Sequence, residues 1–171
     1  STAINNVVLE KVNPSKKIVL TGLVKANSAL TASWSALVDG VVQTFSASTP
    51  LTSTFSATQV SSFLSYPLSV PGNTFVAGST VTFRLLAHFA GNASRSSSFS
   101  DVAIVMNAPP SGGSIGSDPL SGFALSTTFA LTASSWSDDP TDYPLNYEFT
   151  YQKVTNQNAL TVQSKFTSNR V

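Results

Sequence analysis

A regular alternation of apolar and polar side chains runs through Thr80-Val81-Thr82-Phe83-Arg84-Leu85-Leu86-Ala87-His88-Phe89. Successive side chains of an extended chain point to opposite sides, so alternate residues share one face. The apolar face would carry Val81, Phe83, Leu85, Ala87 and Phe89. This period of two predicts a β-strand at 80–89 with one face buried.

Short segments of the same kind lie on both sides of this strand. Val, Ile, Thr and aromatic residues are common in them, as in natural strands. Before residue 107 we expect further strands at 6–10, 17–24, 30–38, 41–46, 66–70 and 97–106. Residues 58–64 allow one helical turn.

Trp34 and Asp39-Gly40 give two local expectations. Trp34 shares one face of the 30–38 segment with Leu30, which predicts that its ring anchors the core. Asp-Gly between two apolar segments is typical of a type I′ hairpin turn. We therefore expect a hairpin at Val38-Asp39-Gly40-Val41.

A segment rich in proline and glycine follows, Asn107-Ala108-Pro109-Pro110-Ser111-Gly112-Gly113-Ser114. The prolines restrict the backbone and favour an extended course, while the glycines let the chain turn away. The segment therefore predicts a semi-rigid connection between two modules. The predicted boundaries are 1–106 for a first β-sandwich domain, 107–113 for the junction and 114–171 for a second domain.

Fewer strands are expected after the junction, at 113–120, 129–133, 145–153 and 159–166. A closed immunoglobulin-like sandwich has about seven strands, so the second domain is expected to be incomplete. The predicted fold class is all-β, with tandem immunoglobulin-like or fibronectin-III-like sandwiches. An incomplete sandwich leaves a sheet edge open, and another polypeptide segment can cover it by β-strand addition.

The composition argues against several classes of function. Charged residues make up 10% of the chain, and 9 basic against 8 acidic residues give a net charge of +1. Nucleic-acid binding favours clustered Lys and Arg. The chain has no cysteine and a single histidine, His88, which we expect at an ordinary surface position. No apolar run reaches the roughly 18 residues of a membrane span. We expect no enzyme, no nucleic-acid partner and no direct membrane insertion.

Several strings resemble the REJ module, the receptor-for-egg-jelly region of polycystin-type and protist surface proteins. They are FVAGSTVTFRL at 75–85, NAPPSGGS at 107–114, SGFALSTTF at 121–129, WSDD at 136–139 and PLNYEF at 144–149. The resemblance extends from Pro67 to Tyr151, and the first strands match by pattern only. It implies a tandem of fibronectin-III-like or PKD-like β-sandwiches in an extracellular protein that belongs to a larger assembly.

One departure from this family concerns a pair of cysteines. Similar modules often have cysteines where this chain has Ile115 and Ala133. A disulfide typically contributes about 2–4 kcal/mol of stability. The resemblance implies that an apolar Ile-Ala contact replaces it, which lowers the independent stability of the second domain.

Asp138, Asp139 and Asp142 lie close together in the sequence, with Asp118 and Glu148 further away. Carboxylate oxygens are the preferred ligands of Ca²⁺. The three clustered aspartates are therefore candidate calcium ligands, and calcium is the one cofactor that the sequence suggests. Their spacing matches no calcium-binding loop, so a solvated acidic turn is the alternative.

Asn92-Ala93-Ser94 matches the N-glycosylation sequon and follows Gly91, which favours an exposed turn. We expect Asn92 to be a glycosylation site if the chain is secreted. Such a modification belongs to extracellular or cell-surface proteins.

Two functions remain open at this point. The first is a non-enzymatic structural spacer or assembly unit of a cell-surface or ciliary fibre, whose partners are other protein chains or domains. The alternative is a module that binds carbohydrates or other glycoconjugates through exposed aromatic rings. The candidate rings are Phe63, Tyr66 and Tyr143.

Overall fold

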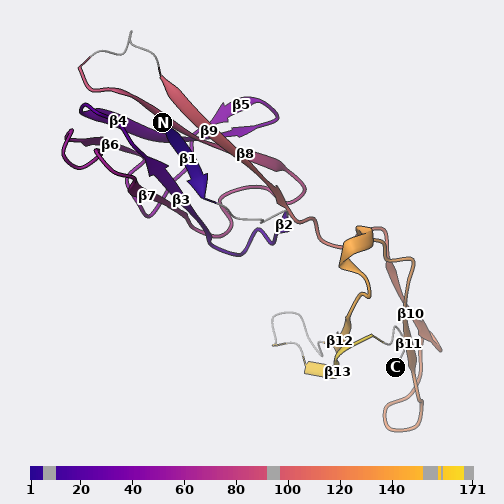
Figure 1. The fold of residues 1–171 in the computed structure, drawn as a ribbon. Coiled ribbons are helices and arrows are strands. Elements are labelled where there is room, and N and C mark those ends of the chain that lie inside the picture. Colours follow the sequence, from indigo (N-terminus) through magenta and orange to yellow (C-terminus); the bar gives the residue numbers. More distant parts are fainter. Residues whose placement is uncertain (6–10, 92–96, 152–157, 159, 168–171) are drawn as a thin grey trace. The chain divides into compact units, whose positions relative to one another are not determined.

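The computed structural model describes residues 1–5, 11–91, 97–151, 158 and 160–167. Its internal contacts divide the chain into two compact units, which we call unit 1 (residues 1–108) and unit 2 (residues 109–171). Both units consist of strands, and no α-helix occurs in the described ranges (Figure 1). The predicted all-β sandwich fold is confirmed.

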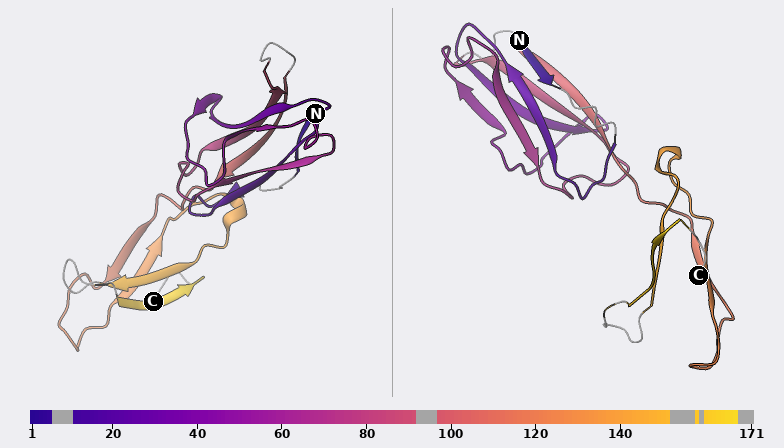
Figure 2. Two further views of the ribbon diagram at one scale, coloured as in Figure 1. Left: turned by 90° about the vertical axis from the view of Figure 1, so that its left-hand side faces the viewer. Right: turned by 60° about the horizontal axis from the view of Figure 1, so that its bottom comes forward.

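Unit 1 is a sandwich of two sheets, seen from two further directions in Figure 2. Its described strands are β1 (Thr2–Asn5), β2 (Lys11–Val12), β3 (Ile18–Val24), β4 (Leu30–Val38), β5 (Val41–Gln43), β6 (Thr52–Phe55), β7 (Leu64–Val70), β8 (Thr80–Phe89) and β9 (Ser98–Met106). One sheet has the order β1-β3-β7. The other has the order β2-β9-β8-β4-β5, and β6 pairs with the amino-terminal half of β4.

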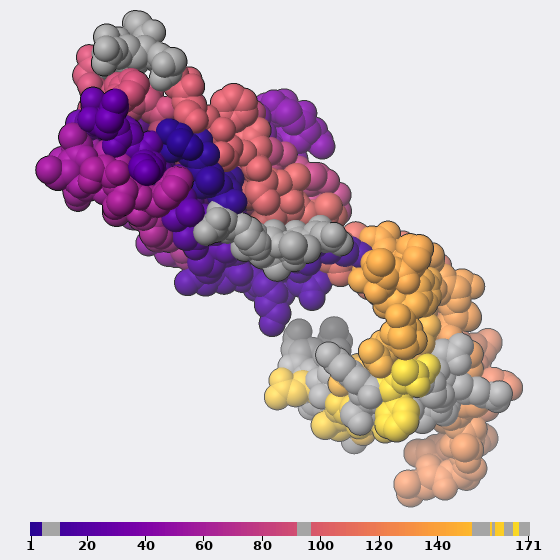
Figure 3. Space-filling view, in the orientation of Figure 1, coloured from indigo at the N-terminus to yellow at the C-terminus, as the bar shows by residue number. Residues whose placement is uncertain are grey.

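The first two strands belong to different sheets although they are neighbours in the chain. β1 pairs antiparallel with β3, whereas β2 pairs in parallel with the end of β9. β1 also contacts β9: the hydroxyl oxygens of Thr2 and Ser98 lie 3.0 Å apart, and the Ser100 hydroxyl donates to Thr2 O at 3.0 Å. Figure 3 shows these two segments side by side. The amino-terminal segment therefore closes one side of the sandwich.

Most predicted strands of unit 1 are confirmed. The structure has strands within or around 17–24, 30–38, 41–46, 66–70, 80–89 and 97–106. The expected strand at 6–10 lies outside the described residues. At 57–60 the chain makes a hydrogen-bonded turn rather than a helix, with the Val60 amide donating to Ser56 O at 3.3 Å.

The core of unit 1 lies between the two sheets and contains the predicted apolar face of β8. Phe83 and Leu85 are fully buried, and Trp34 of β4 is 4% exposed. Gly22 of β3 makes room for this ring, because a Cβ at position 22 would lie 2.7 Å from Trp34 Cζ2 and from Leu85 Cδ2. The predicted core position of Trp34 is confirmed.

Asp39 and Gly40 form the predicted tight turn between β4 and β5. Their φ angles are 51° and 79°, so both residues adopt the left-handed conformation that a type I′ turn requires. Val38 pairs directly with Val41 across the turn. The predicted hairpin is confirmed.

Unit 2 consists of two separate hairpins in its described residues. β10 (Ser114–Asp118) pairs with β11 (Ala130–Ser134), and β12 (Tyr147–Tyr151) pairs with β13 (Leu160–Phe166). A short 3-10 helix, η1 (Pro140–Asp142), lies between β11 and β12 in the chain. All these strands coincide with predicted segments. Ala133 and Phe149 are buried, at 6% and 3% exposure.

Candidate interaction site

The two hairpins of unit 2 leave an open pocket of about 390 Å³ between them. β10 contributes Ile115, β11 contributes Ala133, and β12 contributes Phe149. The remaining lining residues are Pro110 of the junction, Trp136, Leu145 and Asn146 of the segment that connects β11 to β12, and Tyr147 and Glu148 of β12. The inner faces of the hairpins therefore form an apolar hollow.

Large apolar side chains on the strands of unit 2 also remain in contact with solvent. The exposed fraction is 50–66% for Ile115, Tyr151, Leu160, Val162 and Phe166. Unit 1 also exposes large apolar side chains, such as Val76 at 78%, but it has a core of fully buried ones, whereas the described part of unit 2 buries only Ala133 and Phe149 among its apolar residues. Large exposed apolar patches on soluble proteins mark interaction surfaces. Unit 2 is therefore the candidate interaction site of the chain.

The loop between β10 and β11 adds further exposed apolar groups that the strand patterns do not predict. Leu120, Phe123 and Leu125 are each at least 83% exposed. The loop is held by its own hydrogen bonds, since the Phe123 amide donates to Thr127 Oγ1 at 2.9 Å and the Thr127 amide to Phe123 O at 3.1 Å. The sequence feature that could have indicated this apolar loop is the absence of charged residues from 119 to 137.

The proline- and glycine-rich junction that begins at Asn107 is fixed by hydrogen bonds on both of its sides. The Asn107 amide donates to Val12 O at 2.8 Å, and its side-chain Nδ2 donates to Asn13 Oδ1 at 3.0 Å. At the other end, Ser111 and Ser137 exchange two backbone hydrogen bonds of 2.9 and 3.0 Å. Asn107 is thus fixed within unit 1 and Ser111 within unit 2.

Ile115 and Ala133, the positions where similar modules often have cysteines, are direct partners in the register of β10 and β11. Ala133 is buried, whereas Ile115 is 66% exposed. The two residues thus face one another across the hairpin, but the larger side chain lies mostly in solvent. The contact between Ile115 and Ala133 therefore buries less apolar surface than a fully buried pair would.

The structure brings Asp138, Asp139 and Asp142 together, with one carboxylate oxygen of each within 4.8 Å of the others. The Asp139 amide donates to Asp138 Oδ1 at 2.8 Å, so the Asp138 carboxylate helps to stabilise the turn on which the cluster lies. All three side chains are partly or fully exposed. Asp118 ends β10 and Glu148 lies on β12. Calcium binding stays a prediction, and a solvated acidic turn has the same geometry.

The three aromatic candidates for glycan binding differ in their exposure to solvent. Tyr66, one of the candidates, is buried at 5% exposure, and its hydroxyl donates to Pro50 O at 2.8 Å, so its ring does not offer a binding surface. Burial raises its pKa above the usual 10.0. Phe63 of unit 1 and Tyr143 of unit 2 are exposed, and the Phe63 ring has Lys25 Nζ 5.4 Å from its centre.

The outer face of β8 and β9 carries a bidentate ion pair. Arg84 Nε donates to Asp101 Oδ1 at 2.8 Å, and Nη2 donates to Oδ2 at 2.7 Å. The hydrogen bond from Arg84 lowers the pKa of Asp101 below its ordinary 3.8. The guanidinium carbon also lies 4.4 Å from the centre of the Phe99 ring. These contacts fix the pair on the sheet.

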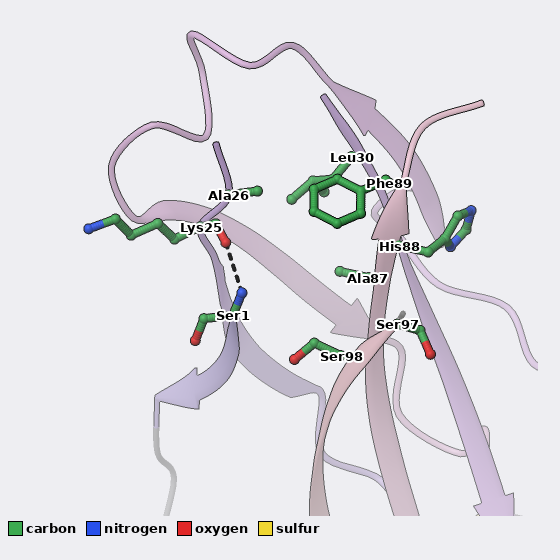
Figure 4. Close-up of a pocket in the computed structure, with 9 residues that line it drawn as sticks. All are labelled: Ser1, Lys25, Ala26, Leu30, Ala87, His88, Phe89, Ser97 and Ser98. Atoms are coloured by element: carbon green, nitrogen blue, oxygen red, sulfur yellow. Dashed lines mark hydrogen bonds between the residues drawn. The ribbon is translucent and has the colours of Figure 1, made fainter. Parts of the chain in front are cut away.

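His88 is one of the residues that line a smaller pocket of unit 1, of about 220 Å³. Its lining includes Leu30, Ala87 and Phe89, and the Ser1 ammonium donates to Lys25 O at 2.9 Å beside it. Figure 4 shows the Lys25 and His88 side chains extending away from these apolar groups. The pocket thus presents apolar and hydroxyl groups rather than a paired acid and base.

Two further features concern glycosylation and membranes. Asn92 lies outside the described residues, so its glycosylation stays a prediction. Gly91, directly before it, has a φ of 79° and belongs to a turn. Within the described parts of the chain, no helix is long and apolar enough to span a bilayer.

Comparison with known proteins identifies the family. A search of curated proteins found no match to the chain. The family model described as REJ domain matches residues 3–170, which include both units. REJ domains are a non-catalytic type of module and occur in extracellular and surface proteins. The resemblance inferred from the five sequence strings is confirmed, and the chain belongs to the REJ domain family.

Proposed function

We propose that this chain is a structural and interaction module of a larger extracellular assembly, such as a cell-surface or cilium-associated fibre. In this role unit 1 is a preformed spacer and unit 2 is the part that joins other polypeptides. The observation that carries the proposal is the contrast between the units. Both units expose some large apolar side chains, but unit 1 has a core of fully buried ones, whereas in the described part of unit 2 Phe149 is the one large apolar side chain that is buried.

The chemistry of the described side chains supports a role without catalysis. The pocket of unit 1 is lined by apolar groups, serine hydroxyls, Lys25 and His88. General acid–base catalysis requires groups positioned within hydrogen-bond reach of a reacting atom. Arg84 and Asp101, the strongest charged pair, satisfy one another on an open sheet face. Binding is therefore the function that these surfaces support best.

Site-specific photo-crosslinking in native material tests this proposal. A benzoylphenylalanine at Ile115 or Leu160, both exposed on unit 2, should form adducts with a recurring extracellular polypeptide identified by mass spectrometry. The matched control is the same group at Val42, which is 67% exposed on β5 of unit 1. Adduct yields from unit 2 no higher than from Val42 would contradict the proposal.

Two further measurements test the finer parts of the proposal. Immunolocalisation on intact cells checks the cilium-associated location, and mass spectrometry of native material checks whether Asn92 carries a glycan. A glycan array serves as the competing test. Saturable binding to one glycan class, without protein adducts from unit 2, would replace the assembly role by carbohydrate recognition.

A further inference from the structure

The segment between β5 and β6 connects the two sheets of unit 1 through its backbone. The Trp34 amide of β4 donates to Leu51 O at 2.8 Å. On the other side, the Ser48 amide donates to Ser69 O of β7 at 2.8 Å, and the Ser69 amide donates to Thr49 Oγ1 at 3.0 Å. No strand is assigned between the end of β5 and the start of β6. Residues 44–51 are therefore fixed on their inner side and unpaired on their outer side.

The side chains of this segment alternate between the core and the solvent. Phe45, Ala47 and Leu51 pack against the core of unit 1, and the centres of the Phe45 and Phe83 rings are 6.1 Å apart. The exposed positions between and beside them are Thr44, Ser46, Ser48, Pro50 and Thr52. We call Thr44, Ser46, Ser48 and Thr52 the hydroxyl row. The segment thus presents a hydroxyl group to solvent at every second position except Pro50.

The hydroxyls of this row are available to an outside partner. In the part of the chain that the structure describes, no hydrogen bond engages the four side chains, whereas Thr54 Oγ1 lies 2.9 Å from Thr31 Oγ1 and Ser56 Oγ donates to Gln59 Oε1 at 3.0 Å. Proteins that recognise peptides often bind them as extended chains and hold alternate side chains in pockets. The backbone and the row together match this mode of recognition.

The sheet edge beside the row carries no charge. β5 ends the larger sheet and all its residues are exposed, while β6 pairs with β4 alone in the described chain. The sequence has no charged residue between Asp39 and Arg84. Natural sheet edges are protected from pairing with other chains by charged side chains or by a cover, among other means. Charged side chains give no such protection at β5 and β6, and a covering group would supply it.

We propose that the hydroxyl row carries O-linked sugars, which cover the β5–β6 edge of unit 1. Segments rich in serine and threonine with nearby proline are typical acceptors of O-linked sugars. In the transfer, the hydroxyl oxygen attacks the anomeric carbon of a sugar activated as a phosphate ester. The bond from this carbon to the phosphate oxygen breaks, the phosphate leaves with the electron pair, and the hydroxyl proton passes to a base of the transferase. This inference rests on the proposed extracellular location of the chain.

Mass spectrometry of native material tests the modification. Trypsin together with a protease that cleaves before aspartate releases residues 39–84 as one peptide, because no charged residue lies between Asp39 and Arg84. We expect this peptide to exceed the mass of its sequence by whole sugar residues, and fragmentation should locate them on the hydroxyl row. A peptide of unmodified mass would overturn the proposal.

Two internal controls accompany this measurement. Ser15 and Ser28 are exposed hydroxyl residues of unit 1 outside this peptide, and both should be unmodified. Sugars at equal occupancy on Ser15 and Ser28 would show that the row is not the preferred acceptor. Asn92 falls in the separate peptide of residues 85–95, so an N-linked sugar on it is measured independently.

A variant with alanine at all four positions of the row locates the acceptors independently of fragmentation. Expressed in the cells that supply the native protein, it should yield peptide 39–84 without added mass. The matched control is the double variant Ser15→Ala and Ser28→Ala, whose peptide 39–84 should keep its sugars. Sugars that remain on the peptide of the fourfold variant would overturn the assignment to the row.

Hydrogen exchange tests the covering role. In the full chain made in bacteria without these sugars, the amides of β5 and β6 should exchange more slowly as the protein concentration rises, because free edges pair with one another. The native, modified chain should show no such dependence. Val42→Lys places a charge on β5 and should remove the dependence, whereas Val19→Lys, on the central strand of the other sheet, should not. Exchange that is independent of concentration in the unmodified chain would overturn the covering role.

The outcomes separate this inference from the broader function. If peptide 39–84 is unmodified while unit 2 forms photo-adducts in native material, the interaction role stands and the modification is overturned. If the peptide carries sugars but unit 2 forms no adducts, the modification stands and the interaction role fails. A chain found inside the cell, without sugars and without adducts, would overturn both.

Discussion

The indole ring of Trp136 lies directly against the backbone of Gly113: a Cβ atom on Gly113 would be 2.0 Å from Trp136 Cδ2. Only a residue without a side chain fits at this distance. The hydrogen-bonded bridge between Ser111 and Ser137 holds the two segments in place. The glycines of the junction and the Trp-Ser-Asp-Asp segment therefore pack as one structural element.

Gly113→Ala should displace the Trp136 ring and destabilise unit 2 by about 1–3 kcal/mol, the usual cost of overpacking. The chain has 2 tryptophans, so their indole N–H signals can be followed separately by NMR. The Trp136 signal should shift while that of Trp34 stays in place. The matched control is Gly116→Ala, where the nearest atom to a new Cβ, Thr132 O, is 3.9 Å away. An unmoved Trp136 signal in Gly113→Ala would contradict this packing.

Gly22→Ala should destabilise unit 1 by a similar amount, about 1–3 kcal/mol, because the new Cβ collides with the buried Trp34 and Leu85 side chains. Urea denaturation followed by far-ultraviolet circular dichroism measures the change in every variant, including those without Trp34. A second substitution that shortens the ring, Trp34→Leu, should make the two effects less than additive. Strict additivity would show that the glycine does not act through the tryptophan.

Asp101 and Arg84 should show a pH-dependent coupling in a double-mutant cycle with Asp101→Asn and Arg84→Gln. The pKa of Asp101 is lowered in the folded state by the hydrogen bond from Arg84, so the pair stabilises the fold above the unfolded pKa of about 3.9. This contribution is lost as the pH falls through the folded value. The side chains are 36% and 32% exposed, so solvent screening keeps the coupling small at neutral pH. A coupling that does not weaken as the pH falls below the unfolded pKa would contradict the assignment.

Replacing both Ile115 and Ala133 by cysteine should give a disulfide between β10 and β11, because these residues are register partners. Directly opposed Cα atoms of antiparallel strands lie about 4.5–5.5 Å apart, within the range that a disulfide bridges. We expect unit 2 to gain about 2–4 kcal/mol under oxidising conditions, measured by denaturation with and without reductant. The chain has no other cysteine, and the serine pair at the same positions is the control. Two titratable thiols after oxidation would show that the register is different.

Alternation in the sequence predicted the strands with one buried and one exposed face. β8 is the clearest case, since Val81, Phe83, Leu85 and Ala87 are all buried. β1 and β6 escaped prediction because they are short, and β6, Thr52–Phe55, alternates between exposed and half-buried side chains without a buried face. Such strands form because they pair with a neighbouring strand, and the alternation in their own sequences is too short to predict them.

The candidate site was predicted less completely, for reasons that depend on three-dimensional packing. The deficit of strands after the junction pointed to an open edge, but the closeness of Trp136 to Gly113 requires knowledge of distant chain segments. The burial of Tyr66 could not be predicted from the sequence, because an aromatic residue at a strand position fits either face. Its burial follows from its neighbours, since Leu68 and Val70 share its face of β7 and are fully buried.

The bidentate ion pair of Arg84 and Asp101 also affects how strongly salt acts on contacts made through this face of unit 1. On the outer face of β4, β8 and β9 in the described chain, these two side chains carry opposite charges and neutralise one another among serine, threonine and apolar residues and His88. Such a surface has little long-range field for dissolved ions to screen, and the Debye length is about 8 Å at 0.15 M ionic strength. Contacts made through this face would therefore hold almost equally well in dilute and in concentrated salt.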